Sequence, residues 1–324
     1  IDTAIRPNGV VGSATGAVGW PDLADLASGG CLNPGSINTD TAVASAASLK
    51  LFKMTGTMAA GCTSAAACTS TVTFDSEGNL YIVDIPFGRI FRISPDRKWT
   101  LVVEYDGWPN GLKIDPRGRI LVADYMHGIM QLDTRAGKML PVLTARNSES
   151  FKGCNDLHIA ANGDIYFTDQ GQTGLHDPTG RVFRLRASGE LNCLIHTGIS
   201  PNGLVLDPAE SVLFVAMTRD NAVWRAPLMK DGSVSKVGRF CSMFGPSGPD
   251  GMTMDAAGRL FVGHASLGHV FVFAPNGEMI ARIKSCAGGA CTNVAIGGAK
   301  RDRLFITESA TGTVLVADIG VLDR

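Results

Sequence analysis

Asparagine and aspartate residues recur at the start of similar apolar segments in this sequence, where their side chains could bind a ligand. Asn110, Asn202 and Asp250 each stand between proline and glycine, and Asn155 is followed by Asp156 in a matching segment. Amide and carboxylate oxygens are the donors that hard cations such as Ca²⁺ prefer. Asn-Gly and Asp-Gly pairs are also ordinary turns into a strand. It is the recurrence of the pattern that favours a binding site.

The spacing of these residues predicts the fold. Six segments repeat one order: a start residue, an apolar strand, a turn and a second apolar strand. Their start residues, which lie 40 to 48 positions apart, are Ser70, Asn110, Asn155, Asn202, Asp250 and Thr292. This period is typical of one four-stranded propeller blade. The sequence therefore predicts an all-β fold, a six-bladed β-propeller with four-stranded blades around a central channel.

The region before the first repeat contains one further strand pattern, the apolar run at residues 48–54. We expect it to supply the outer strand of the last blade, so that the two ends of the chain close the ring together. Residues 48–324 are then a single propeller domain. Residues 1–47 are expected to form an N-terminal extension packed on the outside.

The predicted topology brings two sets of side chains to one face. The second strand of a blade returns antiparallel to the first, so its last residue lies beside the start residue. The last residues are Asp84, Asp124, Asp169, Met217, His264 and Glu308. We therefore expect the functional site to be a pocket at one end of the channel, formed by both sets.

Composition restricts the partners. The net charge is −1, 45% of residues are hydrophobic, and there is neither a run of Lys and Arg nor an apolar stretch of 18 residues. These features argue against nucleic acid and membrane partners and favour a small-molecule ligand. A closed ring leaves no open sheet edge, so we expect a monomer.

Eight cysteines are present, an even number that is typical of disulfide-bonded secreted proteins. Cys286 and Cys291 flank a loop of small residues that could close on itself, as do Cys62 and Cys68. We expect a secreted protein or one in the lumen of the secretory pathway. The alternative is a cytoplasmic protein with buried free thiols.

Several segments resemble the SMP-30/gluconolactonase/LRE-like family, which includes regucalcin, lactonases and diisopropyl fluorophosphatase. They are FDSEGNLYIVDIPFGRIFRISPDR at 74–97, SPNGLVLD at 200–207, GPDGMTMDAAGRLFV at 248–262 and TNVAIGG at 292–298. The resemblance implies a divalent metal, usually Ca²⁺, held by Glu, Asn, Asn and Asp. Asn155, Asn202 and Asp250 match the last three ligands. Ser70 stands in the place of the glutamate, which removes a negative charge, so weaker metal binding or a metal-free channel is expected.

The resemblance implies a lactone or ester hydrolase. A channel metal would then polarise the carbonyl group, and Asp250 would hold the metal or act as a base. His264 or Asp124 would move protons. Asn155, Asn202 and Glu308 complete the candidate catalytic set. The candidate substrate-binding residues are Ser70, Asn110, Trp108, Tyr125, Met126, Asp124, Asp169 and Met217.

Two other functions fit the same face. One is a metal-independent cyclase or synthase acting on an apolar secondary metabolite, through a condensation or a pericyclic step of the Diels–Alder kind. There, positioning supplies much of the rate, and Glu308 is the acid or base. Its apolar wall would be Trp108, Tyr125, Met126, Met130, Met217, Met243 and Phe244. The other is a propeller that binds a small ligand without catalysis.

Overall fold

A single aspartate organises the turn between the first two strands of several repeats. Asp115 Oδ1 accepts hydrogen bonds from the backbone N–H groups of Arg117 and Arg119, at 2.9 and 2.8 Å. Asp255 Oδ1 does the same for Ala257 and Arg259, at 3.0 and 2.8 Å. The following glycine adopts a positive φ, as at Gly118 (φ 79°), which a residue with a side chain rarely tolerates. The repeated Asp and Gly therefore fix where each hairpin reverses.

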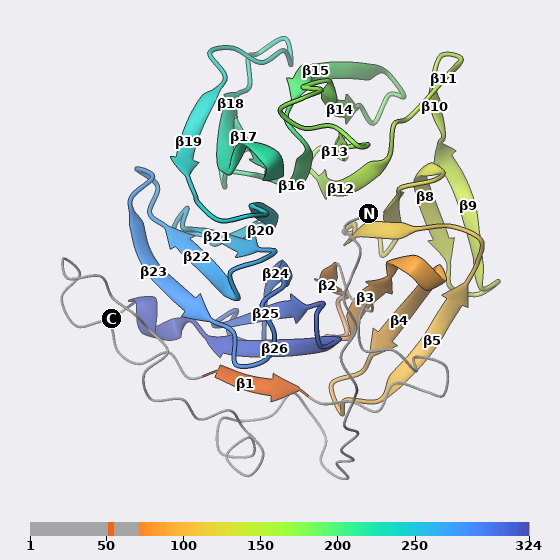
Figure 1. Ribbon diagram of the computed structural model, residues 1–324. Coiled ribbons are helices and arrows are strands. Elements are labelled where there is room, and N and C mark those ends of the chain that lie inside the picture. The colour runs from red at the N-terminus through yellow and green to blue at the C-terminus, as the bar shows by residue number, and fades with distance from the viewer. Residues whose placement is uncertain (1–50, 55–70, 324) are drawn as a thin grey trace.

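The computed structural model describes residues 51–54 and 71–323, which form six four-stranded antiparallel sheets in a ring (Figure 1). The first three sheets are β2 (Val72–Phe74), β3 (Leu80–Asp84), β4 (Arg89–Ile93) and β5 (Trp99–Glu104); β6 (Pro109–Ile114), β7 (Ile120–Asp124), β8 (Gly128–Asp133) and β9 (Lys138–Leu143); and β12 (Cys154–Ile159), β13 (Ile165–Asp169), β14 (Gly180–Leu185) and β15 (Leu191–Gly198). The predicted six-bladed β-propeller is confirmed.

The other three sheets complete the ring. They are β16 (Pro201–Leu206), β17 (Val212–Met217), β18 (Ala222–Pro227) and β19 (Gly238–Ser242); β20 (Pro249–Met254), β21 (Leu260–His264), β22 (His269–Phe273) and β23 (Met279–Lys284); and β24 (Cys291–Gly297), β25 (Arg303–Glu308), β26 (Thr313–Asp318) and β1 (Leu51–Met54). Short elements occupy the connections: η1 (Ile85–Phe87), η2 (Thr218–Asp220), η3 (Gly320–Asp323) and the hairpin of β10 (Ala145–Arg146) and β11 (Glu149–Ser150).

The ring closes through strands from the two ends of the chain. Strand β1 pairs antiparallel with β26, with Leu51 opposite Ala317 and Met54 opposite Val314. This is the outer strand that the apolar run at residues 48–54 predicts. The predicted extension at residues 1–47 lies outside the described residues.

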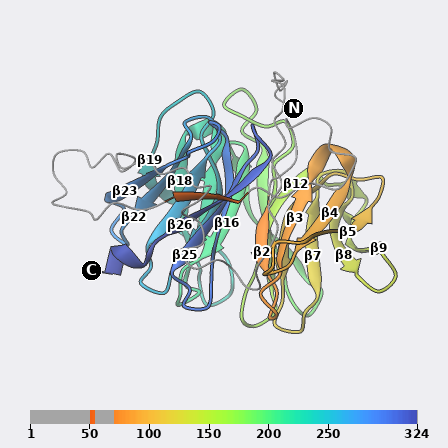
Figure 2. The same cartoon turned by 90° about the horizontal axis from the view of Figure 1, so that it is seen from below.

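The hydrophobic core is divided into six clusters, each between two neighbouring blades. One cluster, for example, joins Val205 and Phe214 of the fourth blade to Met252 and Phe271 of the fifth. The second strands β3, β7, β13 and β21 are buried along their whole length, because both faces pack against another sheet. Viewed from the side, the strands run from one end of the ring to the other (Figure 2).

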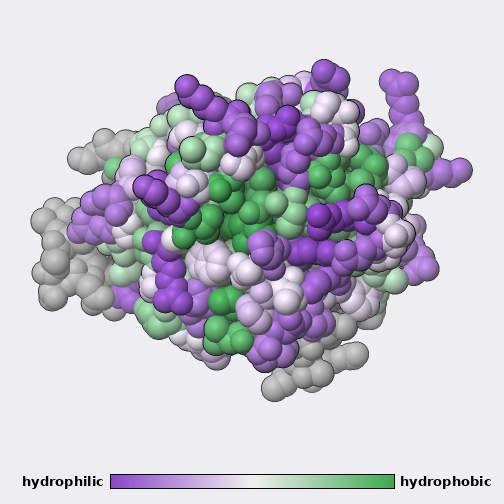
Figure 3. All heavy atoms as spheres, turned by 90° about the horizontal axis from the view of Figure 1, so that it is seen from above, coloured by the Kyte–Doolittle hydropathy of each residue, from purple (hydrophilic) through white to green (hydrophobic). Residues whose placement is uncertain are grey.

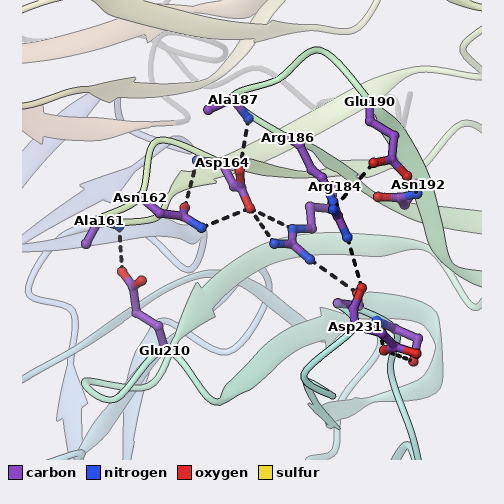
Figure 4. A network of polar contacts seen from close by, with 12 residues as sticks. Ala161, Asn162, Asp164, Arg184, Arg186, Ala187, Glu190, Asn192, Glu210 and Asp231 are labelled. Atoms are coloured by element: carbon purple, nitrogen blue, oxygen red, sulfur yellow. Dashed lines mark hydrogen bonds and ion pairs between the residues drawn. The ribbon is translucent and has the colours of Figure 1, made fainter.

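Polar contacts also join neighbouring blades. Near the ring axis, the hydroxyl of Thr168 donates to the Asn202 carbonyl oxygen at 2.7 Å, and that of Thr218 donates to the Pro249 carbonyl oxygen at 2.7 Å. At the opposite end of the third blade, Asp164 binds the guanidinium of Arg184 (Figure 4). That guanidinium also contacts the following blade. Blade order is therefore fixed at both ends of the ring.

The outer surface mixes polar and apolar side chains (Figure 3). Within the described residues, no helix is long and apolar enough to cross a membrane. Five of the eight cysteines are described, and none of them forms a disulfide with another described residue: Cys154, Cys193, Cys241, Cys286 and Cys291. The bridge expected between Cys286 and Cys291 is absent. Burial raises the pKa of the Cys291 thiol to about 12, which disfavours the thiolate that disulfide formation needs. Cys31, Cys62 and Cys68 lie outside the described residues.

Strand β1 gives a test of ring closure by truncation. Removal of residues 1–56 should lower the melting temperature more than removal of residues 1–47, because only the longer truncation deletes the pairing with β26 and exposes an apolar sheet edge. Thermal unfolding, followed by circular dichroism, compares the two proteins. Equal melting temperatures would show that β1 does not close the ring.

Candidate active site at one end of the ring

The glycines that follow the start residues explain how the blades meet at the axis. A Cβ atom on Gly203 would lie 2.4 Å from the Asp250 carbonyl oxygen, and one on Gly111 would lie 2.6 Å from the Asp156 Cα. No side chain fits at such distances. Pro-Asn-Gly and Pro-Asp-Gly lie inside strands β6, β16 and β20 rather than in turns. Their glycines therefore permit close packing of the inner strands, and the preceding Asn or Asp stands at the strand start.

Asn155, Asn202 and Asp250 come from three consecutive blades and begin neighbouring inner strands. Asn155 and Asn202 are 7% and 8% exposed. The Asn155 amide donates to Gln170 Oε1 at 2.7 Å, and the side chain of Asn202 donates a hydrogen bond to the Asp250 carboxylate. The amide hydrogens are thus turned toward protein acceptors. Among the described residues, the amide oxygens of Asn155 and Asn202 accept no hydrogen bond.

Asp250 has an unusual ionisation. Its removal from water, followed by repulsion from the Asp156 carboxylate, raises the pKa of Asp250 to about 7. The hydrogen bond from Asn202 and the positive charge of Arg219 oppose this shift. A carboxyl group with a pKa near neutrality can accept and return a proton at working pH. The sequence had placed Asp250 at the site, but only the packing shows this ionisation.

Asp156, the neighbour of Asn155, is a second carboxyl group in the same place. It is 2% exposed, and its Oδ1 accepts a hydrogen bond from the Leu157 N–H at 2.8 Å. Its Oδ2 is buried without a hydrogen-bond partner among the described residues. Burial raises the pKa of Asp156, and the charge of Lys113 opposes the rise. An orphaned buried carboxylate oxygen is costly unless something else binds it.

These residues provide a donor set that a hard cation could use. The set contains two amide oxygens, from Asn155 and Asn202, and two carboxyl groups, from Asp250 and Asp156. Oxygen donors of this kind suit Ca²⁺. The described residues contain no cluster of three or more His, Cys, Asp and Glu side chains, so an amide-rich oxygen site for a hard cation fits better than a site for zinc. Ser70, at the position of the family glutamate, lies outside the described residues.

A cleft of about 500 Å³ is lined by Gln170, which binds the Asn155 amide, and by Ser200. Gln170 links Asn155 to the cleft wall, because it accepts from Asn155 and its Nε2 donates to Ser200 Oγ at 2.8 Å. The residues that line the cleft are Gln170, Gly171, Gln172, Thr173, Gly174, Leu175, His176, Ser200 and Arg219. The cleft therefore offers hydrogen-bonding groups next to the Asn155 amide. A small molecule fits its volume.

Sequence reasoning missed Gln170 and Arg219. Gln170 directly follows Asp169 at the end of the second strand, and Arg219 comes two residues after Met217. The signal was their position just beyond the predicted set of last residues. A glutamine or an arginine in a loop cannot be recognised as a site residue from the sequence, because its position depends on the fold of the loop.

Three of the predicted carboxylates, those of Asp124, Asp169 and Glu308, accept hydrogen bonds from protein groups at both oxygens. Asp124 Oδ1 accepts from the N–H groups of Met126 and His127 at 2.8 Å each, and its Oδ2 accepts from the Tyr105 hydroxyl at 2.6 Å. Asp169 accepts from the Gly153 N–H and from the guanidinium of Arg181, at 2.8 and 2.7 Å.

Glu308 is occupied in the same way. Its Oε1 accepts from the N–H groups of Ala290 and Ala310 at 3.0 Å each, and its Oε2 accepts from the Thr311 N–H at 2.9 Å. The side chain is fully buried. This geometry gives Glu308 a structural role, which is the holding of two loops at the last blade.

The remaining predicted residues separate into buried and accessible groups. His264 is fully buried, with Nε2 2.8 Å from the Phe244 carbonyl oxygen, and burial lowers the pKa of its ring. Met217 lies in the core between the third and fourth blades. Trp108 and Tyr125 pack against each other with ring centroids 5.9 Å apart, and Met126 beside them is exposed. Asn110 is partly buried at the start of β6.

The structural role of Glu308 can be tested by substitution. Glu308→Ala should lower the free energy of unfolding by about 3 kcal/mol, because three loop N–H groups lose the buried carboxylate that accepts from them. Urea denaturation measures the change. Glu278→Ala, on an exposed turn, is the matched control and should change it by less than about 0.5 kcal/mol. Equal stability of the two variants would rule out this role.

Asp250 gives a pH test. Its folded-state pKa of about 7 lies above the unfolded value of about 4, so the folded state binds the extra proton and stability falls as pH rises from 4 through 7. Asp250→Asn carries no charge at any pH. It should therefore be more stable than wild type at pH 8, by about 4 kcal/mol, and the gap should close toward pH 4. Urea denaturation of metal-free protein measures this, and a gap independent of pH would contradict the assignment.

Comparison with known proteins identifies the family. Residues 68–310 match the SMP-30/gluconolactonase/LRE-like region. A gluconolactonase of Zymomonas mobilis is 34% identical over 220 residues, which are 62% of this chain and 60% of that protein. The chain thus matches less than two thirds of that relative's length. Lactonase drp35 of Staphylococcus aureus is 30% identical over 224 residues, 65% of this chain and 68% of its own.

Solved structures share the fold. A gluconolactonase from Xanthomonas campestris superposes with a TM-score of 0.72 at 20% identity, covering 98% of this chain and 99% of its own. Regucalcin from Agrobacterium tumefaciens superposes with a TM-score of 0.67 at 21% identity, covering 78% and 90%. The blade order, the glycine-spaced inner strands and the match over residues 68–310 agree, and the chain belongs to the SMP-30/gluconolactonase/LRE-like family.

Proposed function

We propose that this protein hydrolyses a lactone, or a related ester, at the end of the ring where Asn155, Asn202 and Asp250 meet. The observation that carries the proposal is Asp250, a carboxyl group with a pKa of about 7 that is hydrogen-bonded to Asn202 and stabilised by the charge of Arg219, a residue that lines a cleft of about 500 Å³. The gluconolactonase of Zymomonas mobilis and lactonase drp35 support the choice of reaction. The substrate is a small molecule.

The residues present suggest how the reaction proceeds. Asp250 accepts a proton from a water molecule, whose oxygen attacks the carbonyl carbon of the lactone. The ring C–O bond then breaks, and the proton returns to the departing oxygen to give a hydroxy acid. The amide groups of Asn155 and Asn202 orient the reacting atoms, and Gln170 and Ser200 bind polar groups of the substrate at the cleft wall.

A divalent cation, most simply Ca²⁺, is the cofactor we propose for this site. Asn155, Asn202 and Asp250 would hold it, with the orphaned Oδ2 of Asp156 nearby. When bound, such an ion would polarise the carbonyl group and lower the pKa of water. Asp156 would also offset part of the charge lost with the glutamate that Ser70 replaces.

The experiment is a lactonase assay combined with a calcium titration. Proton release from a panel of γ- and δ-lactones should be detected with Ca²⁺ and should fall after chelation. Asp250→Ala should lower kcat/KM by at least about 100-fold, since it removes the base. Ca²⁺ should raise the melting temperature of wild type and not that of Asn155→Ala. Asn192→Ala, on outer strand β15, is the control and should respond as wild type does.

Two outcomes would contradict the proposal. Activity that survives complete chelation would exclude the metal. The absence of turnover for every lactone, together with no response to Ca²⁺, would exclude the hydrolase and favour the metal-independent cyclase or synthase instead.

A further inference from the structure

The loops around the active-site end carry exposed apolar side chains. Met126, Leu175 and Phe244 are 51%, 72% and 58% exposed. They lie after β7, after β13 and after β19, which are three points where the chain reaches this end of the ring. We name these three residues the apolar rim. More than half of each side chain is accessible to water and is available to contact another molecule.

Other exposed apolar side chains of the described residues differ in position or in contacts. Leu101, Leu140 and Val142 lie on outer strands β5 and β9. Met229 follows β18 at the opposite end of the ring. Phe87 lies at the active-site end, but the guanidinium of Arg89 stacks on its ring at 5.1 Å. Isolated exposed apolar residues are common on protein surfaces, whereas several of them around one opening indicate a binding site.

The loops of the apolar rim contact one another. Gln172 Nε2, on the loop that bears Leu175, donates to the Tyr125 hydroxyl at 2.7 Å, and Tyr125 is the neighbour of Met126. Asn221 Nδ2 donates to the Gly245 carbonyl oxygen at 2.9 Å, which ties the loop after β17 to the residue after Phe244. The first contact joins the loops of Met126 and Leu175, and the second joins the loop of Phe244 to the loop that bears Arg219, which lines the cleft together with Leu175.

The apolar rim continues into the polar cleft. Leu175 lines the cleft together with Gln170 and Arg219. Gln170 binds Asn155, and the charge of Arg219 acts on Asp250. A molecule whose reacting group reaches Asn155 and Asp250 would therefore extend along Leu175. Polar groups at the base and apolar groups at the opening suit a molecule with the same division.

We propose that the apolar rim binds an alkyl or aryl substituent of the substrate, so that the substrate class is a lactone bearing an apolar chain or ring. This rests on the proposed lactone hydrolysis. The occupant is part of a small molecule because the rim borders a cleft of about 500 Å³, a volume typical of small-molecule sites. Burial of the substituent against Met126, Leu175 and Phe244 supplies binding energy remote from the carbonyl group.

The test compares γ-lactones of increasing chain length, from γ-butyrolactone to γ-decalactone. For wild type, kcat/KM should rise about threefold for each methylene group that contacts the rim. Leu175→Ser and Phe244→Ser should each flatten this series, because each removes apolar surface from the rim. Met229→Ser, which removes a similarly exposed residue at the opposite end, should keep the wild-type slope.

Failure of the rim and failure of the lactonase are distinguishable. Two results would contradict the proposed role of the apolar rim and leave the lactonase proposal intact. They are the same kcat/KM for short and long chains, and an unchanged dependence of kcat/KM on chain length in both Ser variants. If no lactone reacts, the proposed function fails, and calorimetry with 2-hexyltetrahydrofuran, a non-reacting ether with the same chain as γ-decalactone, still tests the rim. Binding that weakens in Leu175→Ser would support it, and the absence of binding would overturn it.

Discussion

The close approach of the inner strands at the ring axis is the constraint on which the site depends. A Cβ atom on Gly203 would lie 2.4 Å from the carbonyl oxygen of Asp250, and one on Gly251 would lie 2.3 Å from the Asn293 side chain. Glycine is therefore required at these points, and the residue before each glycine begins its strand beside the axis. Thr168 satisfies a backbone carbonyl of the next blade there. The same packing that closes the ring thus gathers polar side chains from separate blades.

Carboxyl groups at this end of the ring divide into two kinds, and their hydrogen bonds show the division. Asp124, Asp169 and Glu308 accept hydrogen bonds at both carboxylate oxygens and fix loops. Asp250 and Asp156 have fewer donors around them; burial raises the pKa of each, and the Asp156 carboxylate adds repulsion at Asp250. A fully hydrogen-bonded carboxylate is a poor base, whereas a desolvated one is a good candidate.

The sequence predicted the fold well because blade periodicity is a local signal. Among the described residues, the start residues from Asn110 onward begin inner strands, and Leu51–Met54 of the predicted strand pairs with β26. The site was predicted as a neighbourhood only. Asp84, Asp124 and Glu308 look equivalent in sequence, since all end a second strand, and only their donors tell them apart. Gln170 and Arg219 belong to no sequence pattern, because their positions depend on how the loops after β13 and β17 fold.

If Ser70 stands in the place of a metal-binding glutamate, as the resemblance to the family implies, a cation in the proposed site would be held differently. Affinity for a hard dication rises with the number of carboxylates. With the glutamate gone, Asp250 and Asp156 are the acids of the described site, and both resist ionisation. A cation bound beside them would have to displace the proton that Asp250 retains near neutrality, so its affinity would rise with pH. The burial of Asp250 and its repulsion from Asp156, which raise its pKa toward that of a useful base, would thus also make metal binding depend on pH.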